Sequence, residues 1–139
     1  MEYYSKVNEN DVAERKRLFG IKPGVYILRS GEVGNPKPIP RMCSVDNDGI
    51  LYIGMSKKLS GGRVSDLKKS LSLDSPSDSH NVGKHYRSNK LLQENYPYDD
   101  FYLELISAET RSEAGCIEGT KLQEYLDNFG ELPPFNRTA

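Results

Sequence analysis

The chain lacks the features that mark membrane proteins, disulfide-rich proteins and repeat proteins. It has no run approaching the ~18 apolar residues that a transmembrane helix needs, and its first residues carry charges where a signal peptide has an apolar stretch. Its two cysteines, Cys43 and Cys116, are too few for a disulfide framework and lack the spacing of a structural zinc site. No segment repeats along the chain. We therefore expect an uncleaved cytoplasmic protein with free thiols.

The composition that remains is that of an ordinary globular domain. The chain has 139 residues, of which 36% are hydrophobic and 28% are charged. This balance excludes wholesale disorder and collagen-like repeats. A chain of this length has room for one hydrophobic core, so we expect a single domain over residues 1–139.

The charged residues are unevenly distributed, although the net charge is only -1. Residues 57–90 contain eight Lys or Arg and three Asp or Glu, whereas residues 91–139 contain three and ten. A basic segment with interspersed rings can follow a nucleic-acid backbone, but a solvated helix face has the same composition. Both interpretations stay open at this point. The candidates for contact with a phosphate backbone include Lys58, Lys68, Lys84, His85 and Arg87.

The apolar pattern predicts a mixed α/β fold. β-branched and aromatic runs bounded by turn residues predict three strands, at residues 24–29, 50–54 and 101–106. Residues 1–22 are expected to hold a lead-in helix capped at Asn10-Asp11. Helical spacing predicts further helices, at residues 63–71, at 84–95 and from Ser112 onward. Two long connections are expected: an inter-strand loop at 30–49, of a length typical of functional or mobile loops, and a flexible, irregular serine-rich loop at 70–83.

One carboxylate lies on the apolar side of the last predicted helix. When residues 113–129 are wound as an α-helix, Glu118 falls at the centre of a stripe that contains Ala114, Leu122 and Tyr125. An ionised carboxylate in that position costs several kcal/mol unless another group pairs with it. A structural salt bridge or a partly exposed edge of the stripe would explain it, and so would a metal ligand or a catalytic acid.

These segments resemble the GIY-YIG nuclease family over nearly the whole chain, from Gly24 to Asn136. Gly24-Val25-Tyr26 is similar to the first signature of the family, and Tyr52-Ile53-Gly54 matches the second. Arg63 matches the catalytic arginine, Glu118 the metal-binding glutamate, and Asn136 the terminal asparagine. The family fold is a small three-stranded, mainly antiparallel sheet flanked by helices, and this is the fold class that we expect.

The resemblance implies a metal-dependent endonuclease that hydrolyses phosphodiester bonds and leaves a 5′-phosphate and a 3′-hydroxyl. DNA is favoured over RNA as the substrate, and the choice between them stays open. Glu118 would hold one Mg²⁺ or Mn²⁺, a cation that keeps several waters and needs few protein carboxylates. Arg63 would neutralise the scissile phosphate with its planar guanidinium. One of the two phenols, Tyr26 or Tyr52, would activate the attacking water, and which one is left open. Gly54 would lie beside the substrate.

The sequence departs from the family pattern at several positions. Met55 stands where many members have a lysine that helps to activate the tyrosine, and Lys57 is a candidate to replace that lysine. The 30–49 connection is longer than usual and is a candidate for contact with the substrate. His80 resembles a histidine of some branches, where it would contact phosphate or relay a proton, although a polar loop histidine is the simpler interpretation.

Two other functions fit the same residues. A nucleic-acid-binding module that kept the fold but lost turnover is favoured by Met55, and a protein-interaction domain is favoured by the near-zero net charge. The expected partner is nucleic acid and not a membrane. Target specificity would come from the two long connections, from a homo-oligomer or from a partner protein.

Overall fold

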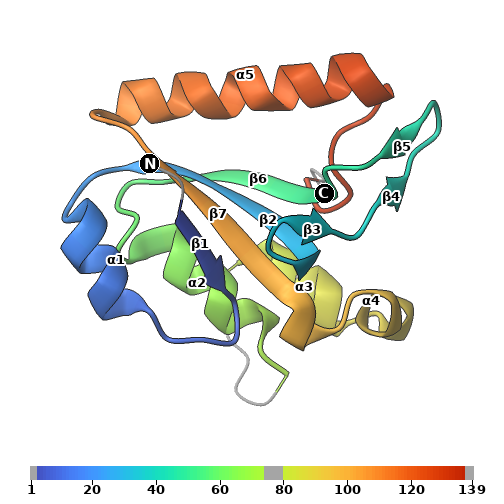
Figure 1. The fold of residues 1–139 in the computed structure, drawn as a ribbon, viewed down its shortest axis with the longest axis horizontal. Helices are drawn as coiled ribbons and strands as arrows, with labels where there is room; N and C mark the ends of the chain where they lie inside the picture. Colours follow the sequence, from blue (N-terminus) through green and yellow to red (C-terminus); the bar gives the residue numbers. More distant parts are fainter. Residues whose placement is uncertain (1–2, 74–79, 137–139) are drawn as a thin grey trace.

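The structure, a computed structural model, describes residues 3–73 and 80–136. Its centre is an antiparallel sheet with helices on both faces (Figure 1). Neighbouring strands in this sheet follow the order β1 (Tyr3–Lys6), β7 (Phe101–Ser107), β2 (Gly24–Glu32) and β6 (Ile50–Ser56). The expected class, a mixed α/β fold whose antiparallel sheet is flanked by helices, is confirmed.

The helices form two layers (Figure 1). The long helix α5 (Arg111–Phe129) lies alone over one face of the sheet, and the other helices lie over the opposite face. Those helices are α1 (Val12–Phe19), α2 (Gly62–Leu71), α3 (Asn81–Arg87) and α4 (Lys90–Asn95), followed by a short 3₁₀ turn at Tyr98–Asp100. Among the described residues, no helix is long and apolar enough to cross a membrane.

Strand β2 supplies residues to the core on both sides of the sheet. Because successive strand residues point to opposite faces, Tyr26 and Leu28 belong to the larger cluster under α1, α2 and α3. Val25 and Ile27 belong to the smaller cluster under α5. β2 is therefore buried on both faces, which explains why its sequence reads as a continuous apolar run.

The sheet contains more than the three expected strands. The N-terminal segment forms β1, which pairs with β7 so that Tyr3 lies opposite Leu105. The end of β2 turns into β3 (Asn35–Pro36), which pairs back onto it. At four residues, β1 is too short for its alternation to stand out from the sequence.

The 30–49 connection, expected as a long inter-strand loop, contains short strands of its own. It contains the last residues of β2, β3 and a small hairpin made of β4 (Ile39–Pro40) and β5 (Val45–Asp46). The Asp46 carboxylate accepts three backbone N–H groups at 2.9–3.1 Å, from residues 48, 49 and 50, which fixes the turn into β6.

The predicted 70–83 loop is shorter than expected. Residues 70–71 belong to α2 and residues 81–83 to α3, while residues 74–79 lie outside the described residues. The single helix expected over 84–95 is two helices, α3 and α4. Asn89 caps α4 with its side-chain oxygen, which accepts the N–H of Leu91 at 2.9 Å, and this cap starts a new helix.

Candidate active site

The register of β2 and β6 brings Tyr26 and Tyr52 together. Tyr26 lies opposite Gly54, and Leu28 lies opposite Tyr52, so the two tyrosines are diagonal neighbours on one face of the sheet. Their ring centroids are 5.9 Å apart. The two signature tripeptides therefore place their phenols side by side, as their alternation predicts.

Gly54 makes room for this pair of rings. A Cβ atom at position 54 would lie 2.6 Å from Cζ of Tyr26 and 2.6 Å from Cε2 of Tyr52. Real carbon atoms do not approach so closely, so any larger residue would displace a ring. Gly54 thus acts on the site through packing.

His80 completes a cluster with the two tyrosines. It is the N-cap of α3, is 2% exposed, and accepts the backbone N–H of Val82 at its Nδ1 atom at 3.2 Å. Its Nε2 atom lies 3.0 Å from the hydroxyl oxygen of Tyr26. Because Nδ1 is an acceptor, we assign the proton of the neutral ring to Nε2, which then donates to Tyr26. The imidazole also meets the Tyr52 ring edge-on, with centroids 5.3 Å apart.

Burial and the charge of Arg63 set the protonation of this cluster. Burial lowers the pKa of His80 to about 4, with a further lowering from Arg63, so the ring is neutral at neutral pH. Burial raises the pKa of both phenols, and the Arg63 guanidinium opposes that rise in each. Arg63 is the second residue of α2. Its Nη1 atom lies 3.6 Å from the Oδ2 atom of Asp66, one turn along the helix.

The two tyrosines are not equivalent. Tyr26 is 1% exposed, whereas Tyr52 is only half-buried. The hydrogen bond between them raises the pKa of Tyr26 and lowers that of Tyr52. Of the two phenols, Tyr52 therefore has the better-stabilised anion and the better access to a substrate.

Glu118 lies on α5, half-buried, and its charge acts on Tyr52. Burial raises the pKa of its carboxyl group. Within residues 3–73 and 80–136, no Lys, Arg or His side chain lies within 4.0 Å of this carboxylate, so the salt bridge considered above is not formed there. The same residues contain no group of three or more Asp, Glu, His or Cys that could hold a metal ion. A single unpaired carboxylate of this kind fits a hard cation that keeps most of its waters.

Asn136 binds the edge of β6 next to Tyr52. Its Oδ1 atom accepts the N–H of Ile53 and its Nδ2 atom donates to the carbonyl of Ile53, both at 2.8 Å. The N–H of Phe135 donates to the carbonyl of Leu51 at 2.8 Å. The C-terminal segment therefore lies along the edge of β6 and fixes the strand that carries Tyr52.

Three of the predicted basic contacts are exposed, and so is Lys57, the candidate to replace the missing lysine. Lys57 and Lys58 follow β6, and Lys84 and His85 lie on α3, four and five residues after His80. His85 meets the Phe135 ring edge-on, with centroids 6.0 Å apart, which places it beside the C-terminal segment.

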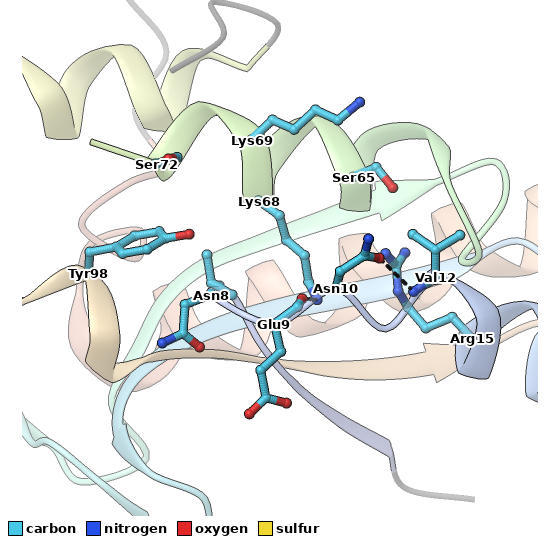
Figure 2. A pocket seen from close by; sticks show the side chains of 11 residues that line it. Asn8, Glu9, Asn10, Val12, Arg15, Ser65, Lys68, Lys69, Ser72 and Tyr98 are labelled. Atoms are coloured by element: carbon cyan, nitrogen blue, oxygen red, sulfur yellow. Dashed lines mark hydrogen bonds between the residues drawn. The ribbon is translucent and has the colours of Figure 1, made fainter. Parts of the chain in front are cut away.

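Lys68 does not lie with them, and the prediction that it binds substrate was wrong. Figure 2 shows its side chain running inward from α2 toward the segment before α1, at a groove of about 340 Å³. Its ammonium donates to Asp11 Oδ1 at 2.7 Å, to the carbonyls of Lys6 and Glu9 at 3.1 Å, and to Ser5 Oγ. All of its donors are used inside the protein.

Arg87 also has a structural contact that the sequence did not reveal. Its Nε atom donates to the carbonyl of Ser70 at 2.8 Å, which joins α3 to the end of α2. At the same crossing, a Cβ atom added to Gly83 would lie 2.2 Å from Ser70 Oγ. This close approach of α3 to α2 sets the position of His80 relative to Arg63.

Met55 lies on the other side of the sheet from the two phenols. Alternation along β6 puts Tyr52 and Gly54 on one face and Ile53 and Met55 on the other. The Met55 sulfur lies 3.9 Å from where a Cβ atom of Gly115 in α5 would be. A side chain at position 55 therefore contacts α5 and is no neighbour of the Tyr52 hydroxyl across the sheet.

Comparison with known proteins gives one structural likeness to report. No family model matches the sequence, and no curated protein matches it significantly. The chain is similar to a crystal structure of the GIY-YIG N-terminal endonuclease domain of UvrC from Thermotoga maritima, a point mutant bound to its catalytic divalent cation. The match covers 94% of this chain and 99% of that chain, with 19% sequence identity and a TM-score of 0.40. The family named there is the one that the sequence motifs resemble.

Proposed function

We propose that this protein is a metal-dependent nuclease of the GIY-YIG type that hydrolyses phosphodiester bonds of DNA. The observation that carries the proposal is the convergence of two phenols, a neutral imidazole and a guanidinium, with the half-buried carboxylate of Glu118 acting on one of the phenols. These groups come from separate elements, β2, β6, α2, α3 and α5. Ordinary core packing gives no reason for so many polar groups to meet at one place.

Tyr52 is the residue that we assign to the attacking water. A phenol is a weak base at neutral pH unless its anion is stabilised. The hydrogen bond from Tyr26 and the charge of Arg63 both stabilise that anion. His80 donates to Tyr26 and so leaves the Tyr26 hydroxyl proton for Tyr52. His80 and Tyr26 thus act as positioning residues for Tyr52.

Arg63 is assigned to the scissile phosphate. Its side chain is 44% exposed, so it is open to a substrate while its charge still reaches both phenols. A planar guanidinium matches the oxygens of a phosphate, and its charge compensates the charge that builds up in the transition state.

Glu118 is assigned to a single divalent cation, with Mg²⁺ as the expected ion and Mn²⁺ as a substitute. The solved domain described above is bound to a catalytic divalent cation, and no Lys, Arg or His among the described residues forms an ion pair with the Glu118 carboxylate. When bound, such a cation acts as a Lewis acid on the phosphoryl group and the leaving oxygen.

A nicking assay on supercoiled plasmid and on single-stranded DNA tests the proposal. We expect cleavage with Mg²⁺, none with EDTA, and a loss of at least about a hundredfold in Glu118→Gln. Glu113→Gln is the matched control, because Glu113 is an exposed carboxylate on the same helix. The products should carry a 5′-phosphate and a 3′-hydroxyl.

Three other outcomes would assign a different function. Equal cleavage by the wild type and Glu118→Gln would identify a contaminating nuclease. Salt-dependent DNA binding without any product would identify a binding module that has lost turnover. Absence of both binding and cleavage would favour a protein-interaction domain.

A further inference from the structure

Two loops on the molecule are joined into one tip, which we call the basic double loop. It consists of residues 20–22, between α1 and β2, and residues 57–61, between β6 and α2. The N–H of Leu59 donates to the carbonyl of Lys22 at 3.0 Å, and Ser60 Oγ donates to the carbonyl of Gly20 at 2.9 Å. These two bonds hold the segments side by side as one unit.

The basic double loop exposes one isoleucine, Ile21, in a tight turn. The N–H of Lys22 donates to the carbonyl of Phe19 at 2.9 Å, which closes a tight turn around Gly20 and Ile21. Gly20 has φ 57° and ψ -121°, the backbone of the first central residue of a type II′ turn. Ile21 is 85% exposed, although isoleucine is among the residue types most often buried. The turn thus presents a branched apolar side chain on a rigid support.

Two lysines of the basic double loop favour an anionic partner, whereas Lys22, next to Ile21, forms an ion pair with Glu109 at 3.1 Å (Nζ to Oε1). Lys57 and Lys58 are exposed, and neither forms an ion pair with any residue that the structure describes. The Lys58 side chain lies 3.5 Å from where a Cβ atom of Gly61 would be, directly before α2 and two residues before Arg63. The tip is therefore continuous with the residue assigned to the scissile phosphate.

We propose that the basic double loop inserts Ile21 between two bases of the bound DNA, next to the cleaved phosphate, while Lys57 and Lys58 contact phosphates beside the inserted residue. This inference rests on the proposed nuclease function. An apolar wedge of this kind partly unstacks a base step and kinks the duplex. Unstacking costs least where the step is already weakened, so the preferred substrate is a duplex with a mismatched or unpaired step.

DNA binding in EDTA tests this inference independently of cleavage. Fluorescence anisotropy with the full chain compares a matched duplex with the same duplex carrying one mismatch, and 2-aminopurine beside the mismatch reports unstacking. We expect the wild type to bind the mismatched duplex about tenfold more tightly and to increase the 2-aminopurine fluorescence. Ile21→Ser should bring the two affinities within about twofold of each other and abolish that increase in fluorescence.

In the double variant Lys57→Ala/Lys58→Ala, the affinities for both duplexes should fall together, and the slope of log affinity against log salt concentration should decrease by about 2.

Leu91→Ser is the matched control, because Leu91 is 67% exposed on α4, outside the basic double loop. It should bind like the wild type. The inference is overturned if Ile21→Ser keeps the mismatch preference, if Leu91→Ser loses it equally, or if the wild type has no preference or no DNA affinity. If Mg²⁺-dependent cleavage is observed but does not depend on Ile21, this inference is wrong and the proposed nuclease function stands. If DNA binding depends on Ile21 but no cleavage occurs, the proposed nuclease function is wrong and the inserted residue stands.

Discussion

The Asn136 side chain pairs with the backbone of Ile53 as a neighbouring strand would. One amide oxygen and one amide nitrogen satisfy both polar groups of Ile53, each at 2.8 Å. The next residue back along β6 is Tyr52, so Asn136 acts on the site through the backbone. This contact makes Asn136 a positioning residue for the phenol that we assign to the attacking water.

Asn136→Ala should therefore lower turnover more than DNA affinity. Loss of the two hydrogen bonds leaves the edge of β6 unpaired at Ile53, at a cost of about 1–3 kcal/mol in the free energy of unfolding. We expect a clear fall in the single-turnover cleavage rate and an unchanged DNA affinity. An equal loss of affinity, measured by anisotropy in EDTA, would instead place Asn136 in contact with the substrate.

The two tyrosines should respond differently to removal of their hydroxyl groups. Tyr52→Phe is expected to slow the chemical step by about 10²–10⁴-fold, the usual contribution of a general base. Tyr26→Phe should have a smaller effect, because it removes a donor to Tyr52 and leaves the base in place. Single-turnover rates at saturating enzyme make the comparison, with Tyr4→Phe, on the edge strand β1, as the control. The reverse order of effects would transfer the role of base to Tyr26.

Lys68→Met should affect stability and not DNA binding. The substitution removes the ammonium that pairs with Asp11 and bonds two backbone carbonyls, and we expect a loss of about 3 kcal/mol in the free energy of unfolding. Lys69→Met, on the exposed side of the same helix, should stay within about 0.5 kcal/mol. Urea unfolding measures both variants. An unchanged stability together with a reduced salt slope of DNA binding would show that Lys68 faces the substrate.

Acid should destabilise the protein through His80. The pKa of His80 is about 4 in the folded protein, against 6.5 for an ordinary histidine, because burial disfavours the charged ring. The unfolded chain therefore takes up a proton between those two values while the folded protein does not. The contribution of His80 to stability is complete above about pH 6.5 and declines as the pH falls toward about 4.

The measurement for His80 is urea unfolding at about pH 7.5 and about pH 5, with His80→Asn as the reference. Asparagine keeps an N-cap acceptor but does not titrate in this range. The wild type should lose more stability than the variant between the two pH values. Equal losses would mean that the ring is hydrated, with an ordinary pKa.

The parts of the fold that follow from local sequence were predicted. β2, β6 and β7 have β-branched and aromatic runs bounded by turn residues, and α5 has a clear apolar stripe. β1 was not predicted, because Tyr3–Lys6 becomes a strand only by pairing with β7 across nearly the whole chain. The break between α3 and α4 depends on one cap, at Asn89, inside an otherwise helical pattern.

The candidate site was predicted in its parts but not in its contacts. Alternation put Tyr26 and Tyr52 on one face, and helical spacing marked Glu118 as an inward carboxylate. The contact of His80 with Tyr26 depends on how closely α3 approaches α2. Local sequence patterns do not predict this distance between two helices. Lys68 was misplaced for a similar reason, since its partners lie in a segment about 57–63 positions away.

Mn²⁺ titration followed by amide NMR tests most directly whether Glu118 holds a divalent cation beside Tyr52. A paramagnetic ion broadens the signals of nuclei close to it, whether or not the protein cleaves DNA. We expect the amide signals around Glu118 and Tyr52 to broaden first at substoichiometric Mn²⁺, and Glu118→Gln to lose this effect while Glu113→Gln keeps it. Broadening centred on other carboxylates, such as Asp46 and Asp48, or unchanged broadening in Glu118→Gln, would contradict the site described here.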